Sequence, residues 1–568
     1  MKGKLKCIVF ALIFMAVLSS CKKDFLQRDP SVAITKDRVF QDPVLASRFG
    51  DNSYNFLLDD YGRLSIPQPH KGTTGQFTDE AVFAATEANH GIIPMNQGNF
   101  LDPNATDVNL VYSRMYSGIR NANIMLSKID SVPWTSAQNP KLMRAQQLFL
   151  RAMFYFELVK RFGGVILLDR ALEQTESFDL PRNTYDETVA FILKDLQEAE
   201  QIFSTESQGT VYTPDNGWDQ GNSGRPATGA AKALRARLLL VNASPLHNPT
   251  NDVAKWKRAA DASKEIIDMN KYSLHTNYKT LLQVASSPEY IWIKVRPARP
   301  GNSASMNDFI IPPSSGGAQG LLNPTQNHVD LYEMSNGKPI TDPTSGYDPQ
   351  DPYKNRDPRF YANIIYNDMT WQGRKIQMWL NITVNPPSYG TDFQPGSNSY
   401  TRTRYYVAKL WPEAARGNQS AAVILNFVFF RYGEFLLNYA EALNEQSGPV
   451  GDVYKYVNEI RTRAGMPGLP VGLTKDQMRE RIHNERAVEL AFEEHRWWDI
   501  LRWKKGVEII PKTIMAMDVE KNASGFKYTP VALASIYQRV FQDYMHLYPI
   551  PRTEIYKSNG ILQQNPGW

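Results

Sequence analysis

The chain has 568 residues, of which 42% are hydrophobic, so it is long enough to bury a large core. Its formal net charge of +5 is small for this length and indicates no nucleic-acid partner. Both cysteines, Cys7 and Cys21, lie near the N-terminus, and this excludes disulfides, thiol catalysis and cysteine-ligated metals from the rest of the chain.

The N-terminal segment has the pattern of an export signal, because lysines at positions 2, 4 and 6 precede an uninterrupted apolar run over 8–18. That run is shorter than the roughly 20 residues that a transmembrane helix needs. Small residues then precede Cys21, as in bacterial lipoproteins. We therefore expect 1–20 to be removed as a signal peptide and Cys21 to be lipidated, which anchors the protein to a membrane without spanning it. An ordinary secretory signal with an incidental cysteine is the alternative.

Apolar residues recur at spacings of three and four in eight segments, which is the pattern of one face of an α-helix. The clearest segment starts at Leu142 and ends before Gly163, and another starts at Ala227 and ends before Pro245. The other six segments are 109–129, 184–203, 253–269, 428–445, 451–464 and 475–503. Eight helices make four antiparallel pairs, so the sequence predicts a mainly α fold with a tetratricopeptide-like scaffold of stacked helix pairs.

The predicted helices fall into two blocks, at about 105–269 and 428–505, separated by a loop-rich insertion at about 270–427. The insertion contains 15 of the 36 prolines, so helices cannot dominate it. Short strands are predicted at 290–293 and 405–408. With the C-terminal segment 506–568, we expect one unit over 21–568, with ligand binding on loops that the helices support.

Glu485, Glu489 and Glu493 are four residues apart on one helical face, close to His483 and His495. They could form an acid/base or metal cluster, but the favoured interpretation is a structural ion network. Its expected cations are Arg481, Arg486, Arg496 and Arg502. The three tryptophans of the same segment are expected in the core: Trp497, Trp498 and Trp503. The sequence shows no zinc-protease, hydrolase-elbow or phosphate-loop motif, so we expect no catalytic residue, no metal and no cofactor.

The chain resembles the SusD/RagB family in an ordered series of blocks that extends over essentially the whole mature protein. These are 21–30 (CKKDFLQRDP), 144–164, 224–249, 323–337 (NPTQNHVDLYEMSNG), 355–360 (NRDPRF), 431–445, 457–467, 484–503, 548–551 and 564–568. One block would be weak evidence, whereas the ordered set is specific.

The resemblance implies a non-catalytic nutrient-binding lipoprotein of the outer membrane that faces the cell exterior. Its expected partner is a SusC-like TonB-dependent β-barrel transporter, over which it rests as a lid. Glycans are the usual ligands of the family, and peptides, as in the RagB branch, are the alternative. A surface glycoside hydrolase and a purely structural lipoprotein are less favoured alternatives.

In family members with a described glycan site, one wall follows a Thr-Asp-Glu motif, here 78–80, and the other precedes the block that begins at Asn323. Sugar rings pack on aromatic faces, and their hydroxyls need polar partners. The resemblance therefore implies ligand-binding roles for Asp79, Phe83, Asn89, His90, Asn307 and Phe309, with Trp218 and Trp371 as further candidates. No tryptophan stands in either wall, so a starch ligand is not carried over, and simple packing is an equal alternative for Phe83.

Overall fold

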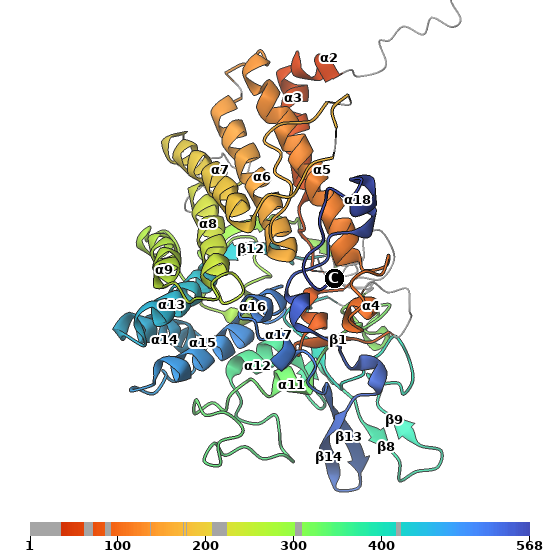
Figure 1. Ribbon diagram of the computed structural model, residues 1–568. Helices are drawn as coiled ribbons and strands as arrows, with labels where there is room; N and C mark the ends of the chain where they lie inside the picture. Colours follow the sequence, from red (N-terminus) through yellow and green to blue (C-terminus); the bar gives the residue numbers. More distant parts are fainter. Residues whose placement is uncertain are drawn as a thin grey trace, which may run out of the picture.

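The computed structural model describes residues 36–61, 72–85, 92–136, 138–173, 175–177, 179–206, 224–300, 309–415 and 422–568. It is mainly helical, with the long helices in one block and the strands and loops of the insertion on the opposite side (Figure 1). This confirms the predicted fold class.

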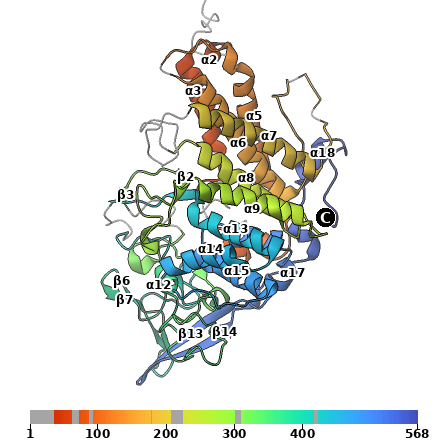
Figure 2. The same cartoon turned by 90° about the vertical axis from the view of Figure 1, so that its left-hand side faces the viewer.

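Each of the eight predicted helical segments contains a helix. The helices are α5 (Thr106–Lys128), α6 (Pro140–Phe162), α7 (Tyr185–Glu206), α8 (Thr228–Ala243), α9 (Val253–Asp268), α13 (Tyr432–Ser447), α14 (Gly451–Arg463) and α15 (Lys475–Glu489). Neighbours in this order pack against each other, and α13 packs on α9 although the insertion separates them in the sequence. Figure 2 shows α9 beside α13, and α14 beside α15. The insertion therefore interrupts the chain but not the helical stack.

Helix α6 shows how local sequence sets the helix ends. The side chain of Asn139 accepts hydrogen bonds from the first-turn backbone N–H groups of Lys141 and Leu142, and Pro140 occupies the first helical position. Gly163 ends the helix at a φ of 71°, which favours glycine. Nearly every residue between these ends is buried, so α6 is a central helix of the scaffold.

Two of the predicted helices differ from the structure. Residues 427–431 form a strand, β12 (Phe427–Arg431), which pairs antiparallel with the predicted strand β2 (Tyr290–Lys294), so α13 begins later than predicted. The predicted helix over 475–503 is two helices, α15 and α16 (Arg496–Arg502). Between them Phe492 and Glu494 have φ of 60° and 66°, a conformation that no α-helix contains.

The strands are short and lie mainly in the insertion. They are β1 (Ala81–Phe83), β3 (Arg299–Pro300), β4 (Leu322–Pro324), β5 (Ile364–Ile365), β6 (Thr370–Trp371), β7 (Arg374–Lys375), β8 (Leu380–Asn381), β9 (Ser388–Tyr389), β10 (Tyr406–Val407), β11 (Ala422–Val423), β13 (Met515–Asn522) and β14 (Gly525–Ala532). β10 confirms the second predicted strand. The C-terminal hairpin of β13 and β14, which the sequence did not predict, joins β8 and β9 in a four-stranded sheet.

Short helices complete the described structure. They are α2 (Lys36–Phe40), α3 (Pro43–Asp51), α4 (Ile92–Asn96), α11 (Gln326–Val329), α12 (Pro358–Asn363), α17 (Gly506–Ile509) and α18 (Arg552–Lys557). Across the described ranges, we find no helix with the length and apolar character needed to cross a membrane.

Candidate functional site

Four of the eight predicted ligand residues lie in the described part of the chain. They are Asp79, Phe83, Phe309 and Trp371. The other four and the predicted lipidation residue lie outside the described residues: Asn89, His90, Asn307, Trp218 and Cys21.

The two predicted walls of the ligand site start from the same short ladder of strands. β1 pairs antiparallel with β4, and Phe83 lies opposite Leu322. The backbone N–H of Ala84 donates to the carbonyl of Leu321 (3.0 Å). The N–H groups of Leu321 and Leu322 both donate to the carbonyl of Phe309, at 2.8 and 3.1 Å. Segments that are more than 200 residues apart in the sequence are therefore brought together at the place where the resemblance implies a site.

The aromatic rings predicted to face a ligand are buried. Phe83, Phe309 and Trp371 are 3%, 1% and 1% exposed and belong to the hydrophobic core. Trp371 packs edge-on against Trp411, with 5.8 Å between ring centroids. This burial favours packing, the alternative that the sequence left open for Phe83. Ring contact with a ligand would require their neighbours to move, and ligand binding at these positions stays a prediction.

Asp79 lies in a buried ion pair with Arg496, whose Nε and Nη2 donate to its two carboxylate oxygens at 2.9 and 2.7 Å. Burial alone would raise the pKa of Asp79, but the charge and hydrogen bonds of Arg496 outweigh it and hold the pKa below its ordinary value. The hydroxyl of Thr325, just after β4, donates to the backbone carbonyl of Asp79. Asp79 thus ties the β1–β4 ladder to α16.

Glu80 fixes the turn between α15 and α16. Its carboxyl group accepts a hydrogen bond from the backbone N–H of Phe492 (3.0 Å), one of the residues with positive φ. Burial raises the pKa of Glu80 to about 8, and the charge of Glu494 acts in the same direction. Since Glu80 is only 2% exposed, it serves this turn rather than a substrate. The Thr-Asp-Glu motif is therefore a structural clamp on the helical block.

The three glutamates of α15 and the following turn form a buried ion network, as the sequence predicted. Glu485, Glu489 and Glu493 are 1%, 0% and 6% exposed. Their cations are Arg359, Lys409, Arg431, Arg461 and Arg463. None of these five was predicted, because they come from the insertion, from β12 and from α14, which pack on this face.

The arginines predicted for this network pair with other acids. The pairs are Arg481 with Glu333, Arg486 with Asp499, Arg496 with Asp79, and Arg502 with Glu441. In the described ranges, no group of three or more His, Cys, Asp or Glu side chains has the arrangement of a metal site.

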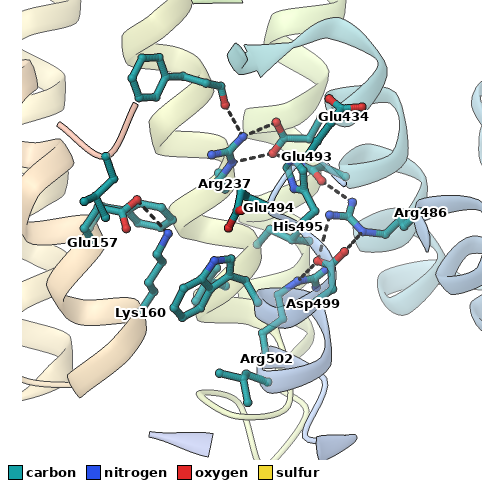
Figure 3. Close-up of a pocket in the computed structure, with 18 of the residues that line it drawn as sticks. Glu157, Lys160, Arg237, Glu434, Arg486, Glu493, Glu494, His495, Asp499 and Arg502 are labelled. Carbon is teal, nitrogen blue, oxygen red and sulfur yellow. Dashed lines mark hydrogen bonds and ion pairs between the residues drawn. The ribbon is translucent and has the colours of Figure 1, made fainter. Parts of the chain in front are cut away.

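A cavity of about 70 Å³ with charged and apolar walls lies between α6, α8, α13 and α16 (Figure 3). Its charged walls are paired: Arg237 with Glu434 at 2.5 Å, and Glu157 with Lys160 at 2.8 Å. This volume holds a few water molecules and is too small for an oligosaccharide. The cavity is therefore a small gap within the scaffold and not a glycan site.

The three tryptophans in and just after α16 differ in burial. Trp497 and Trp503 are buried, as predicted, at 1% and 6% exposed. Trp498 is half-buried and lines the cavity while packing against the core, so the predicted core position holds only in part for it. Its ring lies under the cationic groups of Lys160 and Arg161, each 4.4 Å from the ring centroid, and these cations replace part of its apolar packing.

Two larger depressions lie on the surface. One of about 350 Å³ is formed by α5, α18 and the loop after α6, with mainly apolar walls. The other, of about 410 Å³, lies between α11, α15 and α17 and has Asp79 in its wall. Both fall within the size range of small-molecule sites. Asp79 is thus a predicted ligand residue that lines a described cleft.

Two family models match the chain. That of the SusD family matches 288–568, and a SusD-like model, described as starch-binding associating with outer membrane, matches 61–218. A SusD-like protein of Formosa agariphila is 24% identical over 476 residues, which cover 81% of this chain and 81% of the relative.

Solved structures share the architecture. A SusD-like protein of Bacteroides fragilis is 26% identical with a TM-score of 0.75, covering 95% of this chain and 99% of that protein. A SusD-like carbohydrate-binding protein of the same species has the same fold at 22% identity, with a TM-score of 0.73 and coverage of 92% and 99%. From the two family models, the relatives and the shared fold, the chain belongs to the SusD/RagB family.

Proposed function

We propose that the protein is a surface lipoprotein that captures oligosaccharides and passes them, uncut, to a SusC-like TonB-dependent transporter. The observation that carries this proposal is the meeting of the two implied ligand walls at the β1–β4 ladder. There the backbone carbonyl of Phe309 accepts hydrogen bonds from Leu321 and Leu322, and Phe83 lies opposite Leu322 in the strand pair. Family membership supports it, since one matching model is described as starch-binding and outer-membrane associated.

The acids beside this ladder suit a binding role better than a hydrolytic one. A glycoside hydrolase needs two carboxyl groups that flank the scissile bond and reach the substrate. Asp79 is held in a bidentate pair by Arg496, and Glu80 is enclosed against the α15–α16 turn. Neither is placed to attack or protonate a sugar, which favours capture without cleavage.

Membrane attachment is proposed to depend on Cys21 alone. Each lipid methylene that enters the bilayer contributes about 0.8 kcal/mol, so several acyl chains hold a protein firmly. We expect Cys21→Ser to move the protein from the membrane fraction to the soluble fraction on immunoblots of separated cell fractions. Cys7→Ser is the matched control and should stay in the membrane, because Cys7 leaves with the signal peptide. Retention of the Cys21 variant in washed membranes would contradict the anchor.

The proposed transporter partner is tested by isolating the lipidated protein from native outer membranes with a C-terminal affinity tag. A large β-barrel protein should co-purify with it at moderate salt, since the near-neutral mature chain offers little long-range charge attraction. Isolation without any barrel would reject the partner. Screening of oligosaccharides beside peptides then separates the favoured ligand class from the RagB-type alternative.

A further inference from the structure

The cleft between α11, α15 and α17 lies at the end of the β1–β4 ladder opposite the implied ligand walls. Ala81 pairs with Pro324 at this end, whereas Phe83 pairs with Leu322 at the other. Asp79 precedes β1 and α11 follows β4, so both strands of the ladder connect directly to residues that line the cleft. Its volume of about 410 Å³ admits a small molecule.

His483 gives the cleft an imidazole with unused hydrogen-bonding capacity. The residue is 7% exposed and lines the cleft, and its Nδ1, which is itself shielded from solvent, has no hydrogen-bond partner among the described residues. The ring is stacked on Trp503 with 3.5 Å between centroids and 15° between planes. Burial, reinforced by the positive charges of Arg502 and Lys505, lowers its pKa well below the ordinary value. The imidazole is therefore neutral, with one donor and one acceptor nitrogen.

Asp330 and Asn484 add acceptors on facing walls. One carboxylate oxygen of Asp330 accepts from Gln326 Nε2 (2.6 Å), and no described cation forms an ion pair with this exposed side chain. Asn484 Nδ2 donates to the carbonyl of Leu331 (3.1 Å), which leaves the Asn484 side-chain oxygen without a described partner. The cleft thus has two side-chain acceptors free to take hydrogen bonds from a ligand.

Two of the cations that line the cleft are already paired, and the third, Lys512, shares the wall with the oppositely charged Glu508. Arg496 is bound by Asp79, and Lys505 is paired with Glu480 at 2.7 Å. Neither cation is free to bind an anionic ligand next to His483. The hydrogen-bonding set favours a neutral ligand that donates several hydrogen bonds and accepts one, as vicinal hydroxyl groups do.

We propose that this cleft is a second binding site, which takes a single neutral sugar unit through Asp330, His483 and Asn484. The choice of a saccharide as the polyhydroxyl ligand rests on the proposed function. The site is separate from the implied walls and connects to them through the ladder, so one chain can hold two parts of a glycan or two glycans.

The test is saturation-transfer NMR of the mature protein with methyl β-glucoside, methyl β-galactoside and methyl β-xyloside as probes. We expect at least one probe to bind saturably, and Asp330→Asn to weaken it about ten-fold, as the loss of a hydrogen bond to a charged group does. Asp368→Asn is the matched control, because Asp368 is an exposed acid elsewhere in the insertion. His483→Phe, which keeps an aromatic ring on Trp503, should weaken the same probe. If the His483→Phe variant fails to fold, the Asp330→Asn variant alone still tests the cleft site.

Failure of this site and failure of the proposed function give different results. Absence of any saturable probe signal, or equal affinity in wild type, Asp330→Asn and His483→Phe, overturns the cleft site. Oligosaccharide binding by the same samples then leaves the proposed function standing. An Asn89→Ala and Asn307→Ala double variant should lose oligosaccharide binding at the implied walls and keep the monosaccharide signal. Loss of both signals in that double variant would show that the cleft is not a separate site.

Discussion

Replacing Arg431 with methionine should lower the free energy of unfolding by roughly 3–5 kcal/mol, or prevent folding, because it leaves buried carboxylates without their cation. Arg431 is 1% exposed and donates to Glu289, Glu489 and Glu493, at 2.6, 2.9 and 2.7 Å. Methionine fills similar space and removes only the charge and the donors. Urea unfolding followed by circular dichroism measures the change.

Arg170→Met is the control for this prediction. Arg170 forms an equally short pair with Glu176, but its side chain is 58% exposed, so water replaces the lost partner. We expect this variant to unfold at the same urea concentration as the wild-type protein. Equal stability of the Arg431 and Arg170 variants would show that the buried network contributes nothing to the fold.

Glu80→Gln should change how stability depends on pH. The folded-state pKa of Glu80 is about 8, against an ordinary value of 4.5, because the carboxyl group is buried. Between these two values the folded state keeps a proton that the unfolded state has lost. Stability therefore falls as pH rises, by up to about 1.4 kcal/mol per pH unit for this one group. Glutamine cannot ionise, so the stability of the variant should fall less steeply as pH rises. At the alkaline end of this pH range the variant should be more stable than the wild-type protein.

Thermal melts at a series of pH values across this window measure the difference between the two slopes. Glu198→Gln, at an exposed position of α7, is the matched substitution and should keep the wild-type slope. Parallel slopes for wild type and Glu80→Gln would mean that Glu80 is ionised in the folded protein. An ionised Glu80 at the α15–α16 turn would then have to be neutralised by a nearby cation.

The sequence predicts the helical scaffold well because long amphipathic helices carry a strong period of 3.6 residues. It fails where the deciding interactions are distant. The run at 427–430 (FVFF) is short and wholly apolar, and only its pairing with β2 distinguishes a strand from the start of a helix. Residues 490–495 contain no glycine or proline, yet the helix breaks there, at the turn where Glu80, about 400 residues earlier, binds Phe492.

The candidate site was predicted only in part, for the same reason. Three glutamates at intervals of four indicate a charged face, but the cations that neutralise it come from residues such as Arg359, which lies 126 residues before Glu485. All three positions of β1 are buried, so no alternation of apolar and polar residues marks an outer face around Phe83. The cleft beside His483 unites α11, α15 and α17, and no local motif indicates it.

The proposed capture of oligosaccharides without cleavage is tested most directly by titrating the purified mature protein with a panel of oligosaccharides and analysing the recovered sugars. We predict saturable binding of at least one oligosaccharide and its recovery at full length, with no new reducing ends. Recovery of shortened products would show a hydrolase, and binding of peptides alone would place the protein with the RagB-type alternative. Absence of any saturable ligand would contradict the proposal that this protein captures nutrients.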